Sequence, residues 1–136
     1  LLALDHDYLA AAGLRPGTAL RGVVGLAGPY DFLPLRSETL RAIFGPESRW
    51  PETQPVNHVA PGAPPMLLAT GDADGVVLPR NTESLATRLR AARNPVQSIT
   101  YPGIGHREII GAFASGLRFL APVRQDVLRF VAETTA

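Results

Sequence analysis

The chain has 136 residues, of which 46% are hydrophobic, and this is enough for one domain with a core of ordinary size. Its formal net charge is +1 and its arginines are scattered, so we expect no basic face of the kind that binds nucleic acid or an anionic membrane. It has no cysteine, which excludes disulfides, thiolate metal sites and a cysteine nucleophile. Composition therefore favours a compact domain whose partner is a small molecule.

The first residues of the chain lack any targeting or membrane signal. Residues 1–5 read Leu-Leu-Ala-Leu-Asp, without an initiator methionine, a basic segment or a long apolar run, so we expect neither a signal peptide nor a membrane span. Residues 1–4 are typical of the last turn of a helix that begins upstream. We therefore expect the chain to come from a longer protein, in which residues 5–18, with breakers at Gly13 and Pro16, form a short helical connector.

Two short apolar runs predict buried strands. Residues 20–27 read Leu-Arg-Gly-Val-Val-Gly-Leu-Ala, and residues 64–70 read Pro-Pro-Met-Leu-Leu-Ala-Thr. Runs of this length that end abruptly at turn residues, here Gly28 and Gly71, are typical of strands buried on both faces of a parallel sheet. Between the two strands, residues 40–44 predict one or two helical turns.

The segment from Gly45 to Pro64 is rich in proline. Its prolines, and Pro65 beside them, fix the backbone and remove hydrogen-bond donors, so we expect a long irregular excursion that covers a site. Trp50, the one tryptophan of the chain, lies inside this excursion. We expect it to anchor the excursion on the body of the domain, with a substrate contact as the alternative.

A helix and a third strand follow. Asn81 predicts the N-cap of a helix that extends through Arg93 and buries Leu85 and Leu89 on one face. Residues 96–101, Val-Gln-Ser-Ile-Thr-Tyr, alternate apolar and polar side chains, as a strand near the edge of a sheet does.

The rest of the chain is predicted to be helical. Residues 107–120 are expected to be helical in part, because Gly111 and Gly116 interrupt them. A last amphipathic helix starts near Pro122 and is predicted to bury residues at helical spacing, namely Val123, Val127, Phe130 and Val131. Strands that alternate with helices predict an α/β fold, with right-handed crossovers in a parallel sheet of about three strands and flanking helices.

Two of the predicted strands end in residues that can carry chemistry. Asp72 and Asp74 follow the second strand, and His106 follows the third. Because the carboxyl ends of parallel strands lie at one edge of the sheet, we expect a carboxylate and the imidazole to meet there. An aspartate can accept the Nδ1 proton of a histidine and leave Nε2 free to act as a base. The residues alone leave both aspartates open as the partner.

Three segments carry a resemblance to a known family: Gly-Pro-Tyr-Asp-Phe at residues 28–32, the run at residues 64–77, and Tyr-Pro-Gly-Ile-Gly-His at residues 101–106. With them the sequence resembles the C-terminal part of an α/β-hydrolase of the carboxylesterase or lipase kind, in the group with hormone-sensitive-lipase-like and arylformamidase-like esterases. The resemblance spans nearly the whole chain and implies that residues 1–136 are a partial α/β-hydrolase domain.

The resemblance also implies roles for individual residues. In the family the acid lies in a pattern of Gly, two residues, Asp, two residues, Val, which here is Gly71, Asp74 and Val77. Asp74 is then the catalytic acid and His106 the catalytic base. Family members usually have histidine immediately before that glycine, where this chain has Thr70.

The sequence lacks the third member of a catalytic triad. It contains no Gly-x-Ser-x-Gly motif and no His-Gly-Gly oxyanion motif, and its serines lie outside any such turn: Ser37, Ser48, Ser84, Ser98 and Ser115. In this family the nucleophile precedes the acid and the histidine, so we expect it in a missing upstream half of the same fold. Residues 1–136 alone should then have negligible hydrolase activity, because acyl transfer needs both the nucleophile and the oxyanion donors.

The resemblance implies a serine esterase that cleaves a small carboxylic ester or amide through an acyl-enzyme, with no cofactor and no metal. An arylformamidase or a prolyl-type peptidase is the enzymatic alternative. A non-catalytic hydrolase-like binding module is the alternative of a different class. The oligomeric state and the compartment stay open, with a cytoplasmic location favoured.

Other residues near these motifs have less specific expectations. Tyr30 and Phe32 are expected either to bind the acyl part of a substrate or to pack beneath the excursion. Asp31 is expected to cap a helix or to brace the turn after the first strand. His6 and His58 are expected to be surface or loop residues rather than ligands.

The residues after Asp74 disfavour a calcium loop. Asp72, Asp74 and Glu83 faintly resemble an EF-hand spacing, but Val76 and Val77 occupy positions that need a ligand and a glycine. We therefore interpret the segment as a turn in which Asp72 is a neighbour of the acid.

Overall fold

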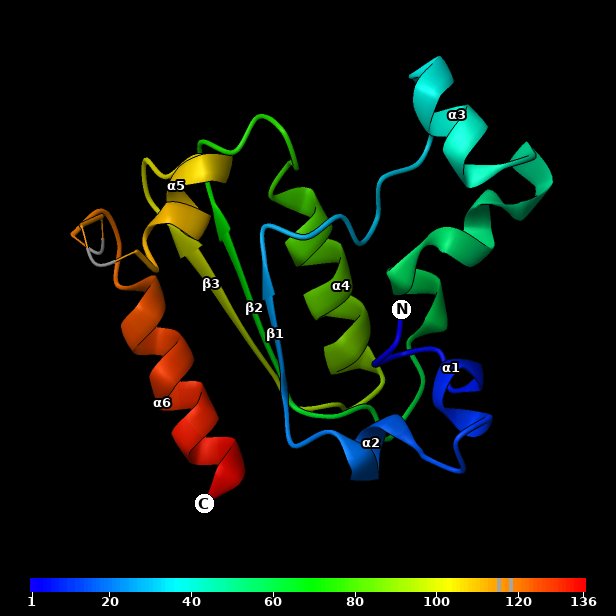
Figure 1. Cartoon of the computed structure of the whole chain (residues 1–136), viewed down its shortest axis with the longest axis horizontal. Helices are drawn as coiled ribbons and strands as arrows, with labels where there is room; N and C mark the ends of the chain where they lie inside the picture. Colours follow the sequence, from blue (N-terminus) through cyan, green and yellow to red (C-terminus); the bar gives the residue numbers. More distant parts are fainter. Residues whose placement is uncertain (115, 118) are drawn as a thin grey trace.

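The computed structural model describes residues 1–114, 116–117 and 119–136. Its centre is a parallel sheet of three strands in the order β1-β2-β3, and Figure 1 shows the three arrows side by side and pointing the same way. The strands are β1 (Val23–Leu26), β2 (Met66–Gly71) and β3 (Val96–Tyr101). The three predicted strands and the α/β fold class are confirmed.

The central strand, β2, is buried at all 6 of its positions. Its Met66 lies opposite Val23 of β1 on one side and Val96 of β3 on the other. A central strand of a parallel sheet is covered by helices on both faces, so an unbroken apolar run suits it. β3 is exposed at its polar positions instead, as its sequence predicts for a strand near an edge.

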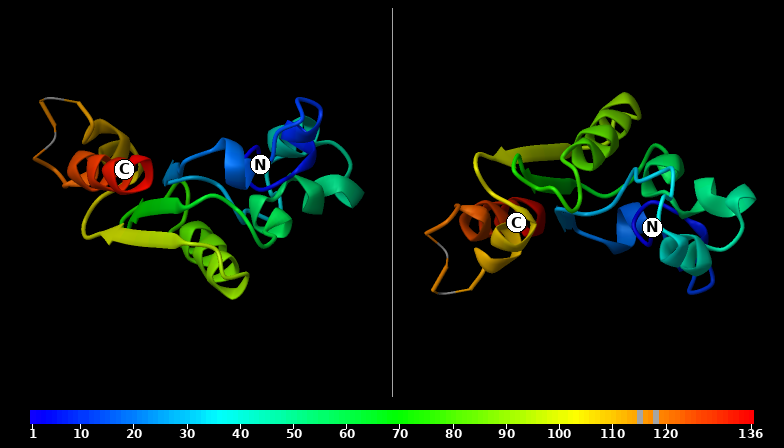
Figure 2. Two further views of the ribbon diagram at one scale, coloured as in Figure 1. Left: turned by 90° about the horizontal axis from the view of Figure 1, so that it is seen from below. Right: turned by 90° about the horizontal axis from the view of Figure 1, so that it is seen from above.

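Helices cover both faces of the sheet. The helix α4 (Arg80–Ala91), which connects β2 to β3, lies on one face, whereas α5 (His106–Gly111) and α6 (Val123–Thr135) lie on the other (Figures 1 and 2). The core under α4 includes Leu4, Met66, Leu68, Leu85, Ala86 and Leu89. The core under α5 and α6 includes Ala69, Tyr101, Ile104, Ile109, Ala112 and Val123.

The buried face of α6 is narrower than its sequence predicts. Val123 and Phe130 are buried, and Val127 packs against the core, as predicted. Val131, however, is 43% exposed, so its predicted burial is wrong. A rotation of about 100° per residue places Val131 about 80° around the helix from Val123, which is beyond the stripe that faces the sheet.

The helix α4 begins earlier than predicted and uses Asn81 differently. Its N-cap is Pro79, and the helix ends two residues before the predicted end, at Ala91. The Oδ1 atom of Asn81 accepts N–H bonds from Tyr30 and Asp31 at 3.0 and 2.8 Å. The predicted N-cap role of Asn81 is therefore wrong, because the turn after β1 takes the side chain that would otherwise cap the helix.

The excursion is not irregular as predicted. After α3 (Glu38–Phe44) the chain forms two 3₁₀ helices, η1 (Glu47–Thr53) and η2 (Pro55–His58), which project together to one side of the sheet (Figure 1). Pro51 lies inside η1, and Pro55 begins η2. A proline in the first turn of a helix loses no hydrogen bond, and 3₁₀ turns are short, so a segment rich in proline can still be helical.

Trp50 fastens the excursion to α3. Its side chain is buried, and its Nε1 donates a hydrogen bond of 2.9 Å to the carbonyl of Gly45, next to the end of α3. The guanidinium of Arg41, on α3, lies 5.8 Å from the centroid of the indole ring, within the range of a cation–π contact. Both contacts lie between η1 and the end of α3, so an anchor on the body of the domain stays a prediction.

The first residues form a turn and two short helices. The carbonyl of Leu1 accepts the N–H groups of Leu4 and Asp5. The helices α1 (Asp7–Ala10) and α2 (Pro16–Ala19) follow before β1. Among the described residues, no helix combines the length and the apolar character that crossing a membrane would need.

The chain between α5 and α6 agrees in part with its predicted helix. The helix α5 ends at Gly111, one of the two predicted interruptions. Ser115 and Arg118, which belong to the predicted helical stretch, lie outside the described residues.

Candidate active site

The carboxyl ends of β2 and β3 bring Asp74 and His106 together. Asp74 lies in the turn after β2, and His106 is the first residue of α5, shortly after β3. The Oδ2 atom of Asp74 is 2.9 Å from Nδ1 of His106, although the two residues are 32 positions apart in the sequence. The sheet thus creates the contact that is expected when two parallel strands end at one edge, where ligands of open α/β sheets bind.

Both oxygens of the Asp74 carboxylate have partners. Oδ1 accepts the N–H groups of Val76 and Val77 at 2.9 and 2.8 Å, and Oδ2 faces His106. Burial alone would raise the pKa of the Asp74 carboxyl, but hydrogen bonds from His106, Val77 and Val76 outweigh burial and hold this pKa below its ordinary value. Asp74 is therefore an ionised acceptor at neutral pH.

His106 keeps its second ring nitrogen available. Because the Asp74 carboxylate is ionised, Nδ1 of His106 donates to it, and the neutral imidazole then has its lone pair on Nε2. The His106 side chain is 32% exposed, whereas that of Asp74 is 0% exposed. Within the described part of the chain, Nε2 of His106 has no hydrogen-bond partner. The arrangement suits a general base at Nε2, because the bond from Nδ1 to Asp74 fixes the orientation of the imidazole ring.

Main-chain contacts join the loop that holds Asp74 to the loop that holds His106. We call residues 71–77 the acid loop and residues 101–106 the histidine loop. Two backbone hydrogen bonds connect them, from Asp72 N–H to the Tyr101 carbonyl at 3.1 Å and from Ala73 N–H to the Ile104 carbonyl at 3.2 Å. Hydrogen bonds therefore hold the two loops together at the carboxyl ends of β2 and β3.

Gly71 is required where the two loops come closest. A Cβ atom at this position would overlap the carbonyl oxygen of Ile104 in the histidine loop. Because the obstacle is backbone and not the end of a flexible side chain, a larger residue would push the loops apart. The glycine that precedes the acid in the sequence pattern thus has a steric reason in this structure.

Asp72 makes a contact that sequence reasoning missed. Its Oδ1 atom accepts the N–H of Gly103 at 2.6 Å, across 31 positions of sequence. Gly103 has a φ of 68°, a left-handed conformation that favours glycine. In the sequence, Gly103 predicts a turn, but it does not predict which residue accepts its N–H.

Comparison with known proteins assigns this arrangement to a family. Residues 19–135 match the prolyl oligopeptidase family. The chain belongs to the prolyl oligopeptidase family. The match covers all three strands and both members of the Asp74–His106 pair, and it confirms the resemblance to α/β-hydrolases.

Relatives of this prolyl oligopeptidase family member include named esterases. The chain is 33% identical over 121 residues to the esterase LipC of Mycobacterium tuberculosis, with 78% of this chain and 30% of that protein covered. A truncated carbohydrate esterase from gut microbiota superposes with a TM-score of 0.67 at 23% identity, over 86% of this chain and 44% of the other. Esterase 2 of Thermogutta terrifontis with bound propionate superposes with a TM-score of 0.60 at 23% identity, over 83% of this chain and 41% of the other.

The chain spans 30% of the length of the curated relative and less than half of each of these two solved structures. The superpositions show a shared α/β-hydrolase fold. Together with the family match, they identify the chain as hydrolase-like. In the relatives, the matched region is one part of a longer chain.

Tyr30 and Phe32 make packing contacts in this structure. Tyr30 packs against the core under α4, and its ring lies so close to Gly25 and Gly28 that a Cβ at either glycine would overlap it. Burial raises the pKa of Tyr30 to about 12. The ring centroid of Phe32 lies 5.3 Å from that of Phe44, at the end of α3. A substrate-binding role for Tyr30 or Phe32 therefore stays a proposal.

The remaining polar residues singled out in the sequence have structural partners or are exposed. Asp31 donates its backbone N–H to Oδ1 of Asn81 in the turn after β1, and the predicted bracing by its carboxylate stays a prediction. Thr70, at the end of β2, is buried. His6 is exposed at the start of α1. Among the described residues, no group of three or more metal-ligating side chains lies together as a metal site.

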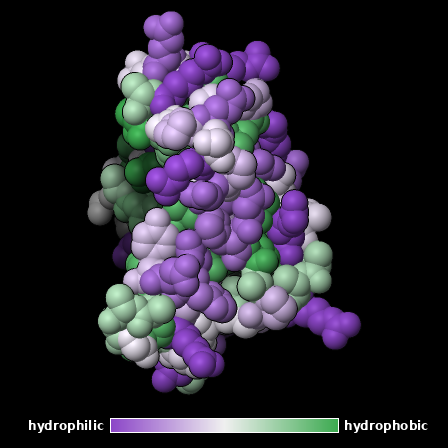
Figure 3. All heavy atoms as spheres, turned by 90° about the vertical axis from the view of Figure 1, so that its right-hand side faces the viewer, coloured by the Kyte–Doolittle hydropathy of each residue, from purple (hydrophilic) through white to green (hydrophobic). Residues whose placement is uncertain are grey.

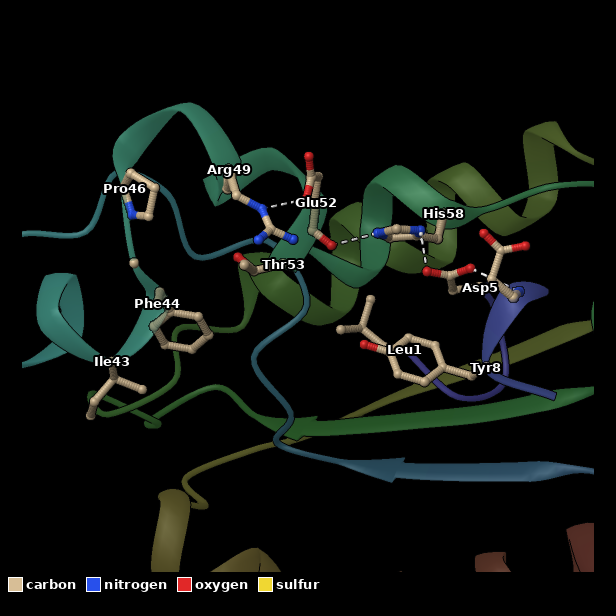
Figure 4. A pocket seen from close by; sticks show the side chains of 12 residues that line it. Leu1, Asp5, Tyr8, Ile43, Phe44, Pro46, Arg49, Glu52, Thr53 and His58 are labelled. Carbon is tan, nitrogen blue, oxygen red and sulfur yellow. Dashed lines mark hydrogen bonds and ion pairs between the residues drawn. The ribbon is translucent and has the colours of Figure 1, made fainter. Parts of the chain in front are cut away.

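A cavity of about 730 Å³ lies apart from Asp74 and His106. Figure 4 shows its lining, which comes from the first turn, α1, α3 and the excursion and does not include the Asp74–His106 pair. In it, His58 connects the excursion to the start of the chain, with Nε2 at 2.6 Å from the Glu52 carbonyl and Nδ1 at 3.3 Å from Asp5 Oδ2. Figure 3 shows that hydrophilic residues cover most of this side of the molecule.

Proposed function

We propose that the chain supplies the acid and the base of a carboxylic ester hydrolase that works through a Ser-His-Asp triad. The observation that carries the proposal is the 2.9 Å contact between Asp74 Oδ2 and His106 Nδ1 at the carboxyl edge of a parallel sheet. The serine and the oxyanion donors would come from a part of the protein outside residues 1–136, which we propose to be a partial domain. Membership of a hydrolase family supports this assignment.

The proposed mechanism assigns one role to each residue. His106 Nε2 takes the proton of the serine hydroxyl as that oxygen attacks the ester carbonyl, and then gives the proton to the leaving alcohol. Water then attacks the acyl-enzyme carbonyl as His106 Nε2 removes a proton from it, and His106 returns this proton to the serine oxygen as the carboxylic acid is released. Asp74 remains ionised, holds the Nδ1 tautomer and stabilises the imidazolium that forms in each step.

Ester and peptide substrates are both compatible with this chemistry, and different observations favour each. The named esterase relatives favour a carboxylic ester, and the propionate bound to one of them favours a small acyl group. The family match favours an amide bond, as in a prolyl-type peptidase, and this is the second candidate. A non-catalytic binding module would need neither the ionised Asp74 nor the free Nε2 of His106, so it is the least favoured alternative.

The test is His106→Ala in the full-length protein, with a p-nitrophenyl ester and a proline-containing peptide p-nitroanilide as substrates. We expect kcat for the preferred substrate to fall by about 10³- to 10⁴-fold, since the variant has no base. His6→Ala, which changes an exposed histidine, is the matched control and should retain full activity.

The substrate that the unmodified enzyme prefers distinguishes an esterase from a peptidase. Equal rates for the His106→Ala variant and the wild type would contradict the assigned base. The absence of turnover in the wild-type full-length protein, with a folded Asp74–His106 pair, would favour the binding module.

A further inference from the structure

We propose that Asp72 is a positioning residue, whose carboxylate holds the histidine loop in the register that brings His106 to Asp74. The effect on catalysis rests on the function proposed above, whereas the structural effect can be measured without it. In the sequence Asp72 is a neighbour of the acid in a turn, and the structure gives its side chain a distant partner.

The bond between Asp72 and Gly103 differs from the usual bond of an aspartate in a turn. A turn-forming aspartate generally accepts an N–H from a residue two positions later in its own turn. Asp72 Oδ1 instead accepts the Gly103 N–H, 31 positions away and at 2.6 Å. A carboxylate acceptor makes this a charge-assisted hydrogen bond, at a position that is exposed to solvent. The Asp72 side chain therefore links two loops and does not stabilise its own turn alone.

The histidine loop gains from such a link because, after Pro102, its sequence has two glycines before His106. It contains Gly103, with a φ of 68°, and Gly105, and α5 after it has 6 residues. The His106 side chain is one-third exposed, so packing alone does not fix it. Glycines leave a loop many accessible conformations, so each contact that restrains the loop narrows the positions of His106.

The contacts between the two loops divide into main-chain and side-chain contacts. Asp72 and Ala73 donate their N–H groups to the carbonyls of Tyr101 and Ile104, and these bonds hold the histidine loop at its first residue and two residues before His106. The Asp72 carboxylate adds the bond to Gly103, which lies three residues before His106. The substitution of Asp72 can thus remove one restraint and leave both main-chain bonds possible, which makes the role testable.

The experiment compares Asp72→Ala, Asp72→Asn and a control, Asp7→Ala, in the full-length protein. Asparagine keeps an oxygen that can accept the Gly103 N–H but removes the charge, whereas alanine removes the acceptor. Asp7 is also an exposed aspartate and lies in α1, outside both loops. Three readouts are recorded: the NMR shifts of the two His106 ring nitrogens, hydrogen exchange at the Gly103 amide, and kcat and KM for the preferred substrate.

We expect Asp72→Ala to raise the exchange rate of the Gly103 amide about tenfold or more, since the amide loses its hydrogen-bond acceptor. The His106 nitrogen shifts should move toward an average of the two tautomers. In an active enzyme kcat should fall about tenfold to a hundredfold with KM nearly unchanged, because the base is misplaced. Asp72→Asn should restore most of all three values, and Asp7→Ala should match the wild type.

Unchanged His106 shifts and Gly103 exchange in Asp72→Ala would overturn the proposal, as would an Asp72→Asn variant as impaired as Asp72→Ala. If Asp72→Ala does not fold, the wild-type protein still decides: a Gly103 amide that exchanges as fast as a free peptide rules out the bond. If the wild type hydrolyses neither substrate, the proposed function fails, but the two NMR readouts still test the positioning role.

Discussion

The two oxygens of the Asp74 carboxylate serve different parts of the site. Oδ1 closes the acid loop through the N–H groups of Val76 and Val77, and Oδ2 orients His106. Because the side chain is fully buried, desolvation opposes its ionisation, and the hydrogen bonds keep it charged. Protonation of this single group would therefore loosen the acid loop and release the histidine together.

This linkage predicts how stability depends on acidity. The pKa of Asp74 is lowered in the folded chain relative to about 3.9 in an unfolded one. Its ionised form therefore contributes stability that is fully present above about pH 4 and is lost as the pH falls through the lowered folded value. Urea unfolding of wild type and Asp74→Asn should show the largest difference in unfolding free energy near neutral pH and a smaller one at about pH 3. A difference that does not change with pH would contradict the assigned ionisation.

At the scale of residues, sequence reasoning located the Asp74–His106 contact but not its supports. That a carboxylate would meet His106 was predictable because parallel strands end at one edge of the sheet. The choice of Asp74 over Asp72 came from the resemblance to the family. The bond from Gly103 to Asp72 was not predictable, because it depends on a left-handed residue in one loop facing a side chain in another. Neither the residue types nor their spacing in the sequence predicts that the Gly103 N–H points toward the Asp72 side chain.

At the scale of elements, buried strands were easier to predict than side-chain caps. The strand β2 is apolar at nearly every position and buried at all of them, so length and composition suffice. The predicted start of α4 was wrong, because the Asn81 side chain can accept N–H groups either from its own helix or from another segment. The turn after β1 offers it two N–H groups, those of Tyr30 and Asp31. The excursion was misjudged because prolines exclude long helices but permit 3₁₀ turns.

The role of Asn81 predicts a specific loss of stability. Asn81→Ala leaves the N–H groups of Tyr30 and Asp31 without their acceptor at a partly buried site. We expect the unfolding free energy to fall by about 2 to 3 kcal/mol, a typical value for buried groups left unpaired. Chemical unfolding followed by circular dichroism measures it. Asn57→Ala, at an exposed asparagine, is the control and should change the value by less than about 1 kcal/mol.

At the scale of the whole molecule, β1 lies at an edge of the sheet, and among the described residues it pairs with β2 alone, so we call this the open edge. Val23 and Ala27 donate their N–H groups to carbonyls of Pro65 and Ala69, on the β2 side. Since successive residues of a strand point their N–H groups to opposite sides, those of Val24 and Leu26 face away from β2. An unpaired edge of this kind is a template for another strand. We propose that a strand from outside residues 1–136 pairs here, in keeping with the partial coverage of the relatives.

Hydrogen exchange tests this open edge. In residues 1–136 alone, the amides of Val24 and Leu26 should exchange quickly, whereas those of Val23 and Gly25 should be protected by pairing with β2. In the full-length protein all four amides should be protected. Fast exchange at Val24 and Leu26 in the full-length protein would show that this edge stays open and that the rest of the fold lies elsewhere.

The position of Asp74 and His106 just after two consecutive strands has a consequence for the order of folding. Residues 66–106 form one continuous β2-α4-β3 unit, so the contacts that pair the two side chains close a short stretch of chain. Short closures are entropically cheaper and faster than contacts with distant segments. We expect the contact between Asp74 and His106 to form early in folding, before the open edge at β1 is covered. On the proposed function, the base would then be in place before the part of the protein that carries the serine packs against it, and this packing would be the step that makes the enzyme active.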